Sequence, residues 1–122
     1  MSSSKARGLK QIYKALTWSY QGLQAGWRFE ASFRLELCLF LILAPLGLWL
    51  GQGALEKTLL VGSLLLVLSM ELLNSAIEAV VDKVSPEFHE LAGRAKDFGS
   101  AAVFLLILNV VLCWGLIVWQ RL

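Results

Sequence analysis

The feature that most limits what this chain can fold into is a set of apolar stretches without charged residues. They lie between Glu36 and Glu56, from 58 to 70, and from 98 to 120. A helix needs roughly 20 mostly apolar residues to cross the hydrocarbon core of a bilayer. The whole chain is 57% hydrophobic and only 16% charged, whereas soluble domains carry about 25% charged residues. The sequence therefore predicts an integral membrane protein.

Other classes of protein are excluded by the same composition. Disordered chains have low hydrophobicity, and a disulfide scaffold is excluded because Cys38 and Cys113 both lie inside apolar runs. The formal net charge is only +2, and the 11 basic residues form no long patch. No nucleic-acid partner is therefore implied.

The apolar stretches and their end signals predict one all-α domain over residues 1–122. The Gly51-Gln52-Gly53 turn ends the first span and Ser85-Pro86 ends the second, because proline disfavours helix at its own position and the one before it. We expect a surface helix at about 5–27, transmembrane helices at about 30–50, 56–84 and 92–120, and a cytoplasmic loop at about 85–91.

The predicted surface helix is amphipathic. At 100° per residue one side of it is apolar, while Lys10, Gln11, Lys14 and Gln21 fall opposite. Such a helix is expected to lie on the membrane surface, although a soluble helix packed on a core would show the same pattern. The apolar stripe consists of Leu9, Ile12, Tyr13, Leu16, Tyr20, Leu23 and Trp27.

The distribution of Lys and Arg predicts the orientation, since these residues concentrate on the cytoplasmic side. The first predicted loop carries only Lys57 and the C-terminal end only Arg121. The N-terminus is therefore expected in the cytoplasm, and three spans place the C-terminus outside. The basic residues on the predicted cytoplasmic side are Lys5, Arg7, Lys10, Lys14, Arg28, Arg34, Lys83, Arg94 and Lys96.

Polar residues in the second span form a stripe that lipid would not tolerate. Glu71, Asn74, Ser75, Glu78 and Asp82 share one helix face, and a carboxylate at the bilayer centre costs about 3 kcal/mol by insertion scales. A hydrogen-bonded interface between helices is one explanation. Carboxylate and amide oxygens are also the ligands that Mg²⁺ prefers, with water and phosphate completing its shell. The stripe predicts either an interface or a metal site.

Further charged residues flank this stripe. Glu30 precedes the first span, with Arg34 one turn on as a possible ion-pair partner, and Glu36 lies on a different face. The predicted loop continues the acidic face and adds Glu87, His89, Glu90, Arg94, Lys96 and Asp97. Such a charge run is often only a solvated surface, but its position would let Lys96 meet a phosphate held by the same metal. No P-loop motif is present, so a nucleotide site would be built differently.

Three segments together resemble one known family. WSYQGLQAGWRFEASFRLE (18–36), ELLNSAIEAVVD (71–82) and EFHELAGRAKDFGSAAV (87–103) resemble the bacterial integral-membrane diacylglycerol kinases over nearly the whole chain. The undecaprenol kinases of the same superfamily share the E-x-x-N-x-x-x-E core and remain an alternative. The resemblance implies MgATP-dependent phosphorylation of a lipid hydroxyl by a homotrimer in the inner membrane, with its C-terminus in the periplasm and its sites between subunits.

Carried over by position, the resemblance also implies site residues. Glu71 matches the catalytic base, and Glu30 and Glu78 match the metal-binding carboxylates. Two positions depart from the family pattern, since Gln11 stands where Arg is usual and Trp18 where Tyr is usual. The ATP-binding residues would be Gln11, Trp18, Glu30, Asn74, Glu78, Glu87, His89, Lys96 and Asp97. The lipid-binding residues would be Ser19, Arg34, Glu36, Trp49, Glu71, Ser100 and Trp114.

A protein of a different class, a small proton-coupled transporter, would also carry glutamates on one face of a membrane helix. A transporter function would not explain the Glu-His-Lys-Asp loop. Labelling of a lipid by ATP would separate these two functions.

Overall fold

The computed structural model describes residues 2–87 and 89–122, with side chains from residue 7 onward, so the side chain of Lys5 lies outside the described part. The expectation of an all-helical protein with three candidate membrane spans is confirmed, because the second, third and fourth helices are long and apolar enough to cross a bilayer. The helices are α1 (Ser2–Phe29), α2 (Ala31–Leu50), α3 (Gly53–Val84) and α4 (Glu90–Arg121).

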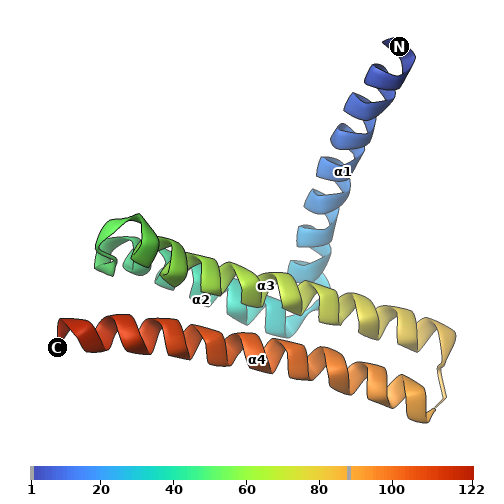
Figure 1. Ribbon diagram of the computed structural model, residues 1–122. Coiled ribbons are helices and arrows are strands. Elements are labelled where there is room, and N and C mark those ends of the chain that lie inside the picture. The colour runs from blue at the N-terminus through green and yellow to red at the C-terminus, as the bar shows by residue number, and fades with distance from the viewer. Residues whose placement is uncertain (1, 88) are drawn as a thin grey trace.

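Short connections force the three long helices α2, α3 and α4 to lie side by side (Figure 1). Gly53, which opens α3, has a φ of 84°, in the left-handed region that favours glycine. α3 ends at Val84, directly before Ser85-Pro86. Between α1 and α2 only Glu30 is outside a helix, with an extended backbone, and α1 points away from the other helices (Figure 1).

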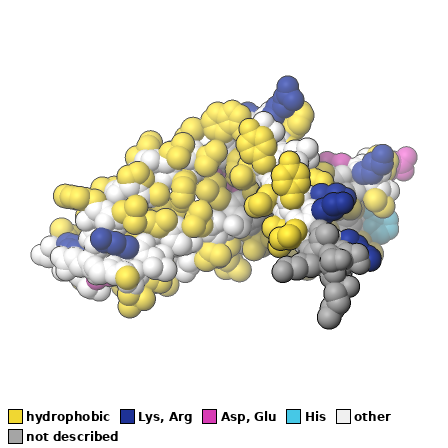
Figure 2. All heavy atoms as spheres, turned by 90° about the horizontal axis from the view of Figure 1, so that it is seen from above, with side chains coloured by type: hydrophobic (Ala, Val, Ile, Leu, Met, Phe, Trp, Pro, Cys, Tyr) yellow, Lys and Arg dark blue, Asp and Glu magenta, His cyan; other side chains and the backbone are white. Residues whose placement is uncertain are grey.

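The buried core is narrow, and the outer surface of the bundle is apolar. Among the described side chains, Phe33 and Leu60 are the large ones that are fully buried. Hydrophobic side chains cover most of the face seen in Figure 2, while acidic and histidine side chains gather mainly at one end. An apolar outer surface of this extent suits a lipid environment rather than water. The other buried hydrophobic residues are Ala44, Leu64, Val67, Val103 and Ile117.

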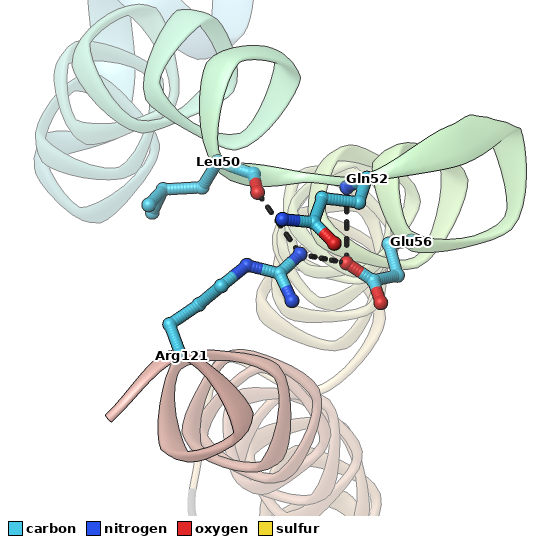
Figure 3. Close-up of polar contacts among 4 residues, drawn as sticks. All are labelled: Leu50, Gln52, Glu56 and Arg121. Atoms are coloured by element: carbon cyan, nitrogen blue, oxygen red, sulfur yellow. Dashed lines mark hydrogen bonds and ion pairs between the residues drawn. The ribbon is translucent and has the colours of Figure 1, made fainter.

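At the end of the bundle where α4 finishes, Arg121 ties three helices together (Figure 3). Its guanidinium donates to the Leu50 carbonyl at 3.2 Å and pairs with the Glu56 carboxylate. The same carboxylate oxygen accepts from the backbone N–H of Gln52 at 3.0 Å. We refer to Leu50, Gln52, Glu56 and Arg121 as the C-terminal clasp. It fixes the end of α4 against the turn between α2 and α3.

At the junction of α1 and α2, Arg34 has a different partner from the one considered above. Its Nη1 donates to the carbonyls of Trp27 at 2.9 Å and Arg28 at 3.2 Å. In the described part of the chain it forms no ion pair with Glu30. Carbonyls in the last turn of a helix lack intrahelical donors, so Arg34 caps the end of α1 and stabilises the sharp turn there.

Candidate active site

The polar stripe of α3 turns toward the protein at its deepest positions. Glu71 and Asn74 are each only 8% exposed, whereas Glu78 is half-buried and Asp82 is exposed. The Asn74 amide Nδ2 donates to the Glu78 carboxylate Oε1 at 3.3 Å. The stripe therefore runs from a buried carboxyl group to an exposed one, and its polar groups become more accessible toward the α3–α4 loop.

Asn74 lies directly against α4. A Cβ atom at Gly99 would stand 2.1 Å from the Asn74 Oδ1 atom, so only glycine leaves room for this side chain. Oδ1 is buried and accepts no hydrogen bond in the described part of the chain. Buried amide oxygens are normally satisfied. The amide oxygen of Asn74 thus packs against Gly99, while its amide nitrogen holds the Glu78 carboxylate.

Two more carboxyl groups approach Glu71 from the other side. Glu36 on α2 lies next to Glu71, and its Oε2 atom is buried without a partner in the described chain. The charges of Glu30 and Glu78 also act on Glu71. The helical wheel placed Glu36 away from Glu30, but the packing of α2 against α3 brings it to the buried end of the stripe. The carboxyl groups of Glu30, Glu36, Glu71 and Glu78, called the carboxyl cluster below, are therefore spread over the two turns of α3 between Glu71 and Glu78.

Two clefts open beside these carboxyl groups. A cleft of about 710 Å³ lies between α1 and α3; Ser19 and Glu30 line it, with small residues such as Ser75 and Ala79 opposite. A second cleft of about 290 Å³ is enclosed by α2, α3 and α4, and Glu36 is the one charged residue among its lining side chains. Both clefts are mainly apolar, and each brings one carboxyl group, Glu30 or Glu36, to an apolar surface.

A third pocket of about 140 Å³ lies at the loop between α3 and α4, where Asp82, Glu87, His89 and Lys96 meet. The Lys96 ammonium is 2.6 Å from the Asp82 carboxylate. His89 is the N-cap of α4, and its Nδ1 atom accepts from the Leu91 N–H at 3.1 Å. The structure therefore brings Glu87, His89 and Lys96 together, as the resemblance implied for a nucleotide site.

The remaining predicted site residues are spread over the molecule. Gln11 and Trp18 are exposed on α1, and Asp97 and Ser100 are exposed on α4. Trp49 is 78% exposed near the end of α2. A single chain therefore does not gather these five residues into the carboxyl cluster.

Trp114 is placed far from Glu71. Its indole Nε1 donates to the Leu60 carbonyl at 3.0 Å, and Leu60 precedes Glu71 by about 16 Å along α3. Its position supports packing of α4 on α3 toward the C-terminal clasp, rather than contact with the reacting end of a substrate.

Asp82 is the residue whose role was missed in the sequence. The sequence places it in the polar stripe without indicating a partner, and the structure pairs it with Lys96. Its spacing of four residues from Glu78 was the available signal. The partner on α4 could not be inferred, because it depends on how the loop returns the chain.

The carboxylate groups beside α3 are ligands of the kind that a divalent ion requires. In the described residues no three His, Cys, Asp or Glu side chains form a ready-made metal site. Mg²⁺ does not require one, because it usually takes one or two carboxylates and completes its shell with water and phosphate oxygens. The half-buried Glu30 and Glu78 carboxylates provide donors of this kind. The residues present fit Mg²⁺.

Comparison with known proteins gives a consistent result. Residues 17–118 match the family model described as prokaryotic diacylglycerol kinase. The diacylglycerol kinase of Escherichia coli K12 is 44% identical over 119 residues, covering 98% of each chain. That of Haemophilus influenzae is 46% identical over 111 residues, covering 91% of this chain and 94% of its own. With the carboxyl cluster and the resemblance of its three motifs, these matches show that the chain belongs to the prokaryotic diacylglycerol kinase family.

Proposed function

We propose that this protein transfers the γ-phosphoryl group of MgATP to the primary hydroxyl of diacylglycerol, giving phosphatidic acid at the cytoplasmic membrane face. The observation that carries the proposal is the burial of Glu71 and Asn74 within a candidate membrane span, beside two mainly apolar clefts that Glu30 and Glu36 line. The relatives from Escherichia coli and Haemophilus influenzae are named diacylglycerol kinases. A reaction between a water-soluble nucleotide and a lipid needs such a site.

Glu30 and Glu78 are the residues that would hold Mg²⁺. When bound, the ion neutralises charge on the phosphate oxygens during phosphoryl transfer. Asn74 supports Glu78 through the 3.3 Å hydrogen bond from its amide, which orients the carboxylate.

Glu71 is proposed as the general base that accepts the proton of the lipid hydroxyl. It lies seven residues from Glu78, or about 10 Å along the helix, deeper in the span. That depth suits a hydroxyl that rises from the bilayer while ATP arrives from the water. The proton moves from the hydroxyl oxygen to a Glu71 carboxylate oxygen, as the oxygen attacks the γ-phosphorus and ADP leaves. Lys96 would offset negative charge on the phosphates.

The nucleotide is proposed to lie between the loop pocket and the metal-binding carboxylates. Glu87, His89 and Lys96 line that pocket. Trp18 is 64% exposed on α1, so its indole ring is accessible for stacking on adenine. Gln11 and Asp97, which are also exposed, would complete the site from α1 and α4.

The lipid is proposed to approach Glu71 from the membrane. Ser19 lines the cleft between α1 and α3, and Glu36 lines the apolar cleft next to Glu71. Arg34 holds the turn between α1 and α2. Ser100 would contribute from α4, while Trp49 and Trp114 would contact lipid toward the opposite side of the membrane.

The protein is proposed to lie in the bacterial inner membrane with its N-terminus in the cytoplasm and its C-terminus in the periplasm. The excess of Lys and Arg on one side of the spans supports this orientation. The apolar stripe of α1 is exposed, with Leu9 63% and Leu16 67% accessible, which suits an amphipathic helix on the membrane surface.

A homotrimer is proposed as the active form. Asp97 and Ser100 on α4 are exposed in the single chain. Small residues along α3 and α4 allow helices to approach closely. A neighbouring subunit could therefore supply the nucleotide contacts that one chain leaves open.

The proposal is tested with purified protein, MgATP and separate lipids: diacylglycerol, undecaprenol, ceramide and monoacylglycerol. Phosphorylated diacylglycerol is expected as the main product. Undecaprenol phosphate instead would assign the protein to the other branch of the superfamily, and proton-driven transport without any labelled lipid would indicate a transporter.

The role of Glu71 is tested in the same assay with Glu71→Gln. The amide cannot accept the hydroxyl proton, so turnover should fall by about 10²-fold or more, the size typical of a general base. MgATP binding should be largely retained because Glu71 is not assigned to the nucleotide. Turnover near the wild-type rate would contradict the assignment.

A further inference from the structure

The loop pocket contains an ion pair that joins two helices. Lys96 on α4 places its Nζ atom 2.6 Å from the Asp82 Oδ1 atom at the end of α3. The two side chains are 41% and 65% exposed. Exposed ion pairs contribute little to stability, because the gain is screened by water and offset by side-chain ordering. The position of this ion pair therefore points to a role other than holding α3 and α4 together.

The residues around the Asp82–Lys96 pair indicate what that role is. The pocket is lined by the carboxyl groups of Asp82 and Glu87, by His89, and by Lys96. Among its lining residues, Lys96 is the one that carries a full positive charge at neutral pH, and its charge is already matched by Asp82. A triphosphate entering this pocket would meet two carboxylates and a paired ammonium group. Phosphate can bind Lys96 well only if Asp82 gives it up.

We propose that Asp82 is a positioning residue, which holds Lys96 at the pocket in the nucleotide-free enzyme and is replaced as its partner by the triphosphate of ATP. This inference rests on the proposed kinase function and adds a residue that the resemblance does not assign. In this ion-pair exchange Lys96 leaves Asp82 for a phosphate group, and the protein neither gains nor loses a charge. It makes the affinity for nucleotide depend on how strongly Asp82 competes for the ammonium group.

The test measures the dissociation constant of a non-hydrolysable ATP analogue with Mg²⁺, by calorimetry on the purified protein in detergent. Asp82→Asn removes the competing charge, so the analogue should bind about two- to fivefold more tightly, the range expected for an exposed ion pair.

Two control variants separate ion-pair exchange from a general change in charge. Glu90→Gln removes an acid that pairs with Arg94 at 3.2 Å on α4 and does not line the pocket, so it should leave the dissociation constant unchanged. Asp82→Glu keeps the carboxylate and should behave as the wild type. Equal tightening in either control, or unchanged or weaker binding in Asp82→Asn, would overturn the proposal.

A double variant tests whether the effect passes through Lys96. In a Lys96→Gln background there is no ammonium group to release, so Asp82→Asn should change the dissociation constant less than it does alone. The same change in both backgrounds would contradict the exchange. Failure of the kinase function itself is recognised separately, since the wild type would then neither bind the analogue nor phosphorylate a lipid.

Discussion

At the scale of single residues, the contact between Gly99 and Asn74 gives a sharp prediction. A methyl group at position 99 would stand 2.1 Å from the Asn74 Oδ1 atom. Gly99→Ala must therefore push Asn74, and with it the hydrogen-bonded Glu78, out of place. Because displacement of about 1 Å in an active site can reduce the rate about 10²-fold, we expect a loss of kcat of that order.

The same helix offers a matched control for this substitution. Nothing lies within 4 Å of the Cβ position at Gly115, so Gly115→Ala should keep full lipid kinase activity. Alanine in a helix interior is favoured over glycine by about 1 kcal/mol, and thermal unfolding in detergent should show equal or higher stability. Similar activity losses in both variants would contradict the role given to Gly99.

His89 combines two roles that substitution can separate. Its Nδ1 atom caps α4 by accepting from the Leu91 N–H at 3.1 Å, and it also lines the loop pocket. His89→Ala removes both, and loss of an N-cap costs about 1 kcal/mol. His89→Asn keeps a good cap. We expect the Asn variant to recover the unfolding temperature in detergent but not the KM for ATP. If His89→Asn restored neither, the capping role would be wrong.

At the scale of secondary-structure elements, the C-terminal clasp decides how firmly α4 is held. The side chains of Arg121 and Glu56 are 25% and 22% exposed, so their pairing is less screened than that of a surface pair. Arg121→Ala leaves the Glu56 carboxylate and the Leu50 carbonyl without their donor. We expect thermal unfolding in detergent to show a lower unfolding temperature for Arg121→Ala than for the wild type.

Arg94→Ala serves as the comparison for the clasp. Its pair with Glu90 is 52% and 83% exposed, and an i,i+4 pair of this kind contributes about 0.3–0.5 kcal/mol. A larger loss of stability for Arg94→Ala than for Arg121→Ala would contradict the importance of the clasp. The clasp lies at the opposite end of the bundle from the loop pocket, so Arg121→Ala should change KM for ATP little.

At the scale of the whole molecule, exposure of Asp97 predicts a site shared between subunits. Glu71→Gln and Asp97→Asn should each abolish activity alone. When the two inactive variants are mixed in detergent and reassembled as random trimers, about one quarter of the sites should contain both intact residues. We expect lipid kinase activity to return to about that fraction of the wild-type value. No recovery above the separate variants would indicate that each site is built from one chain.

The sequence by itself determined the properties that depend on residues close together in the chain. Apolar stretches and their Gly and Pro end signals predicted the all-α class and three candidate spans, which the structure confirms. The motifs around Glu71 and Lys96 indicated the family, which the relatives confirm. Spacing was enough for these conclusions because helical periodicity and hydrophobic length are local properties.

Only the tertiary structure decided which helices present their polar groups to one another. It placed Glu36 beside Glu71 and packed Asn74 against Gly99. It also directed Arg34 to the end of α1 rather than to Glu30, and paired Lys96 with Asp82. These partners depend on the rotation and register of packed helices. Rotation and register are set by the summed contacts of side chains distant in sequence, so no single motif could specify them.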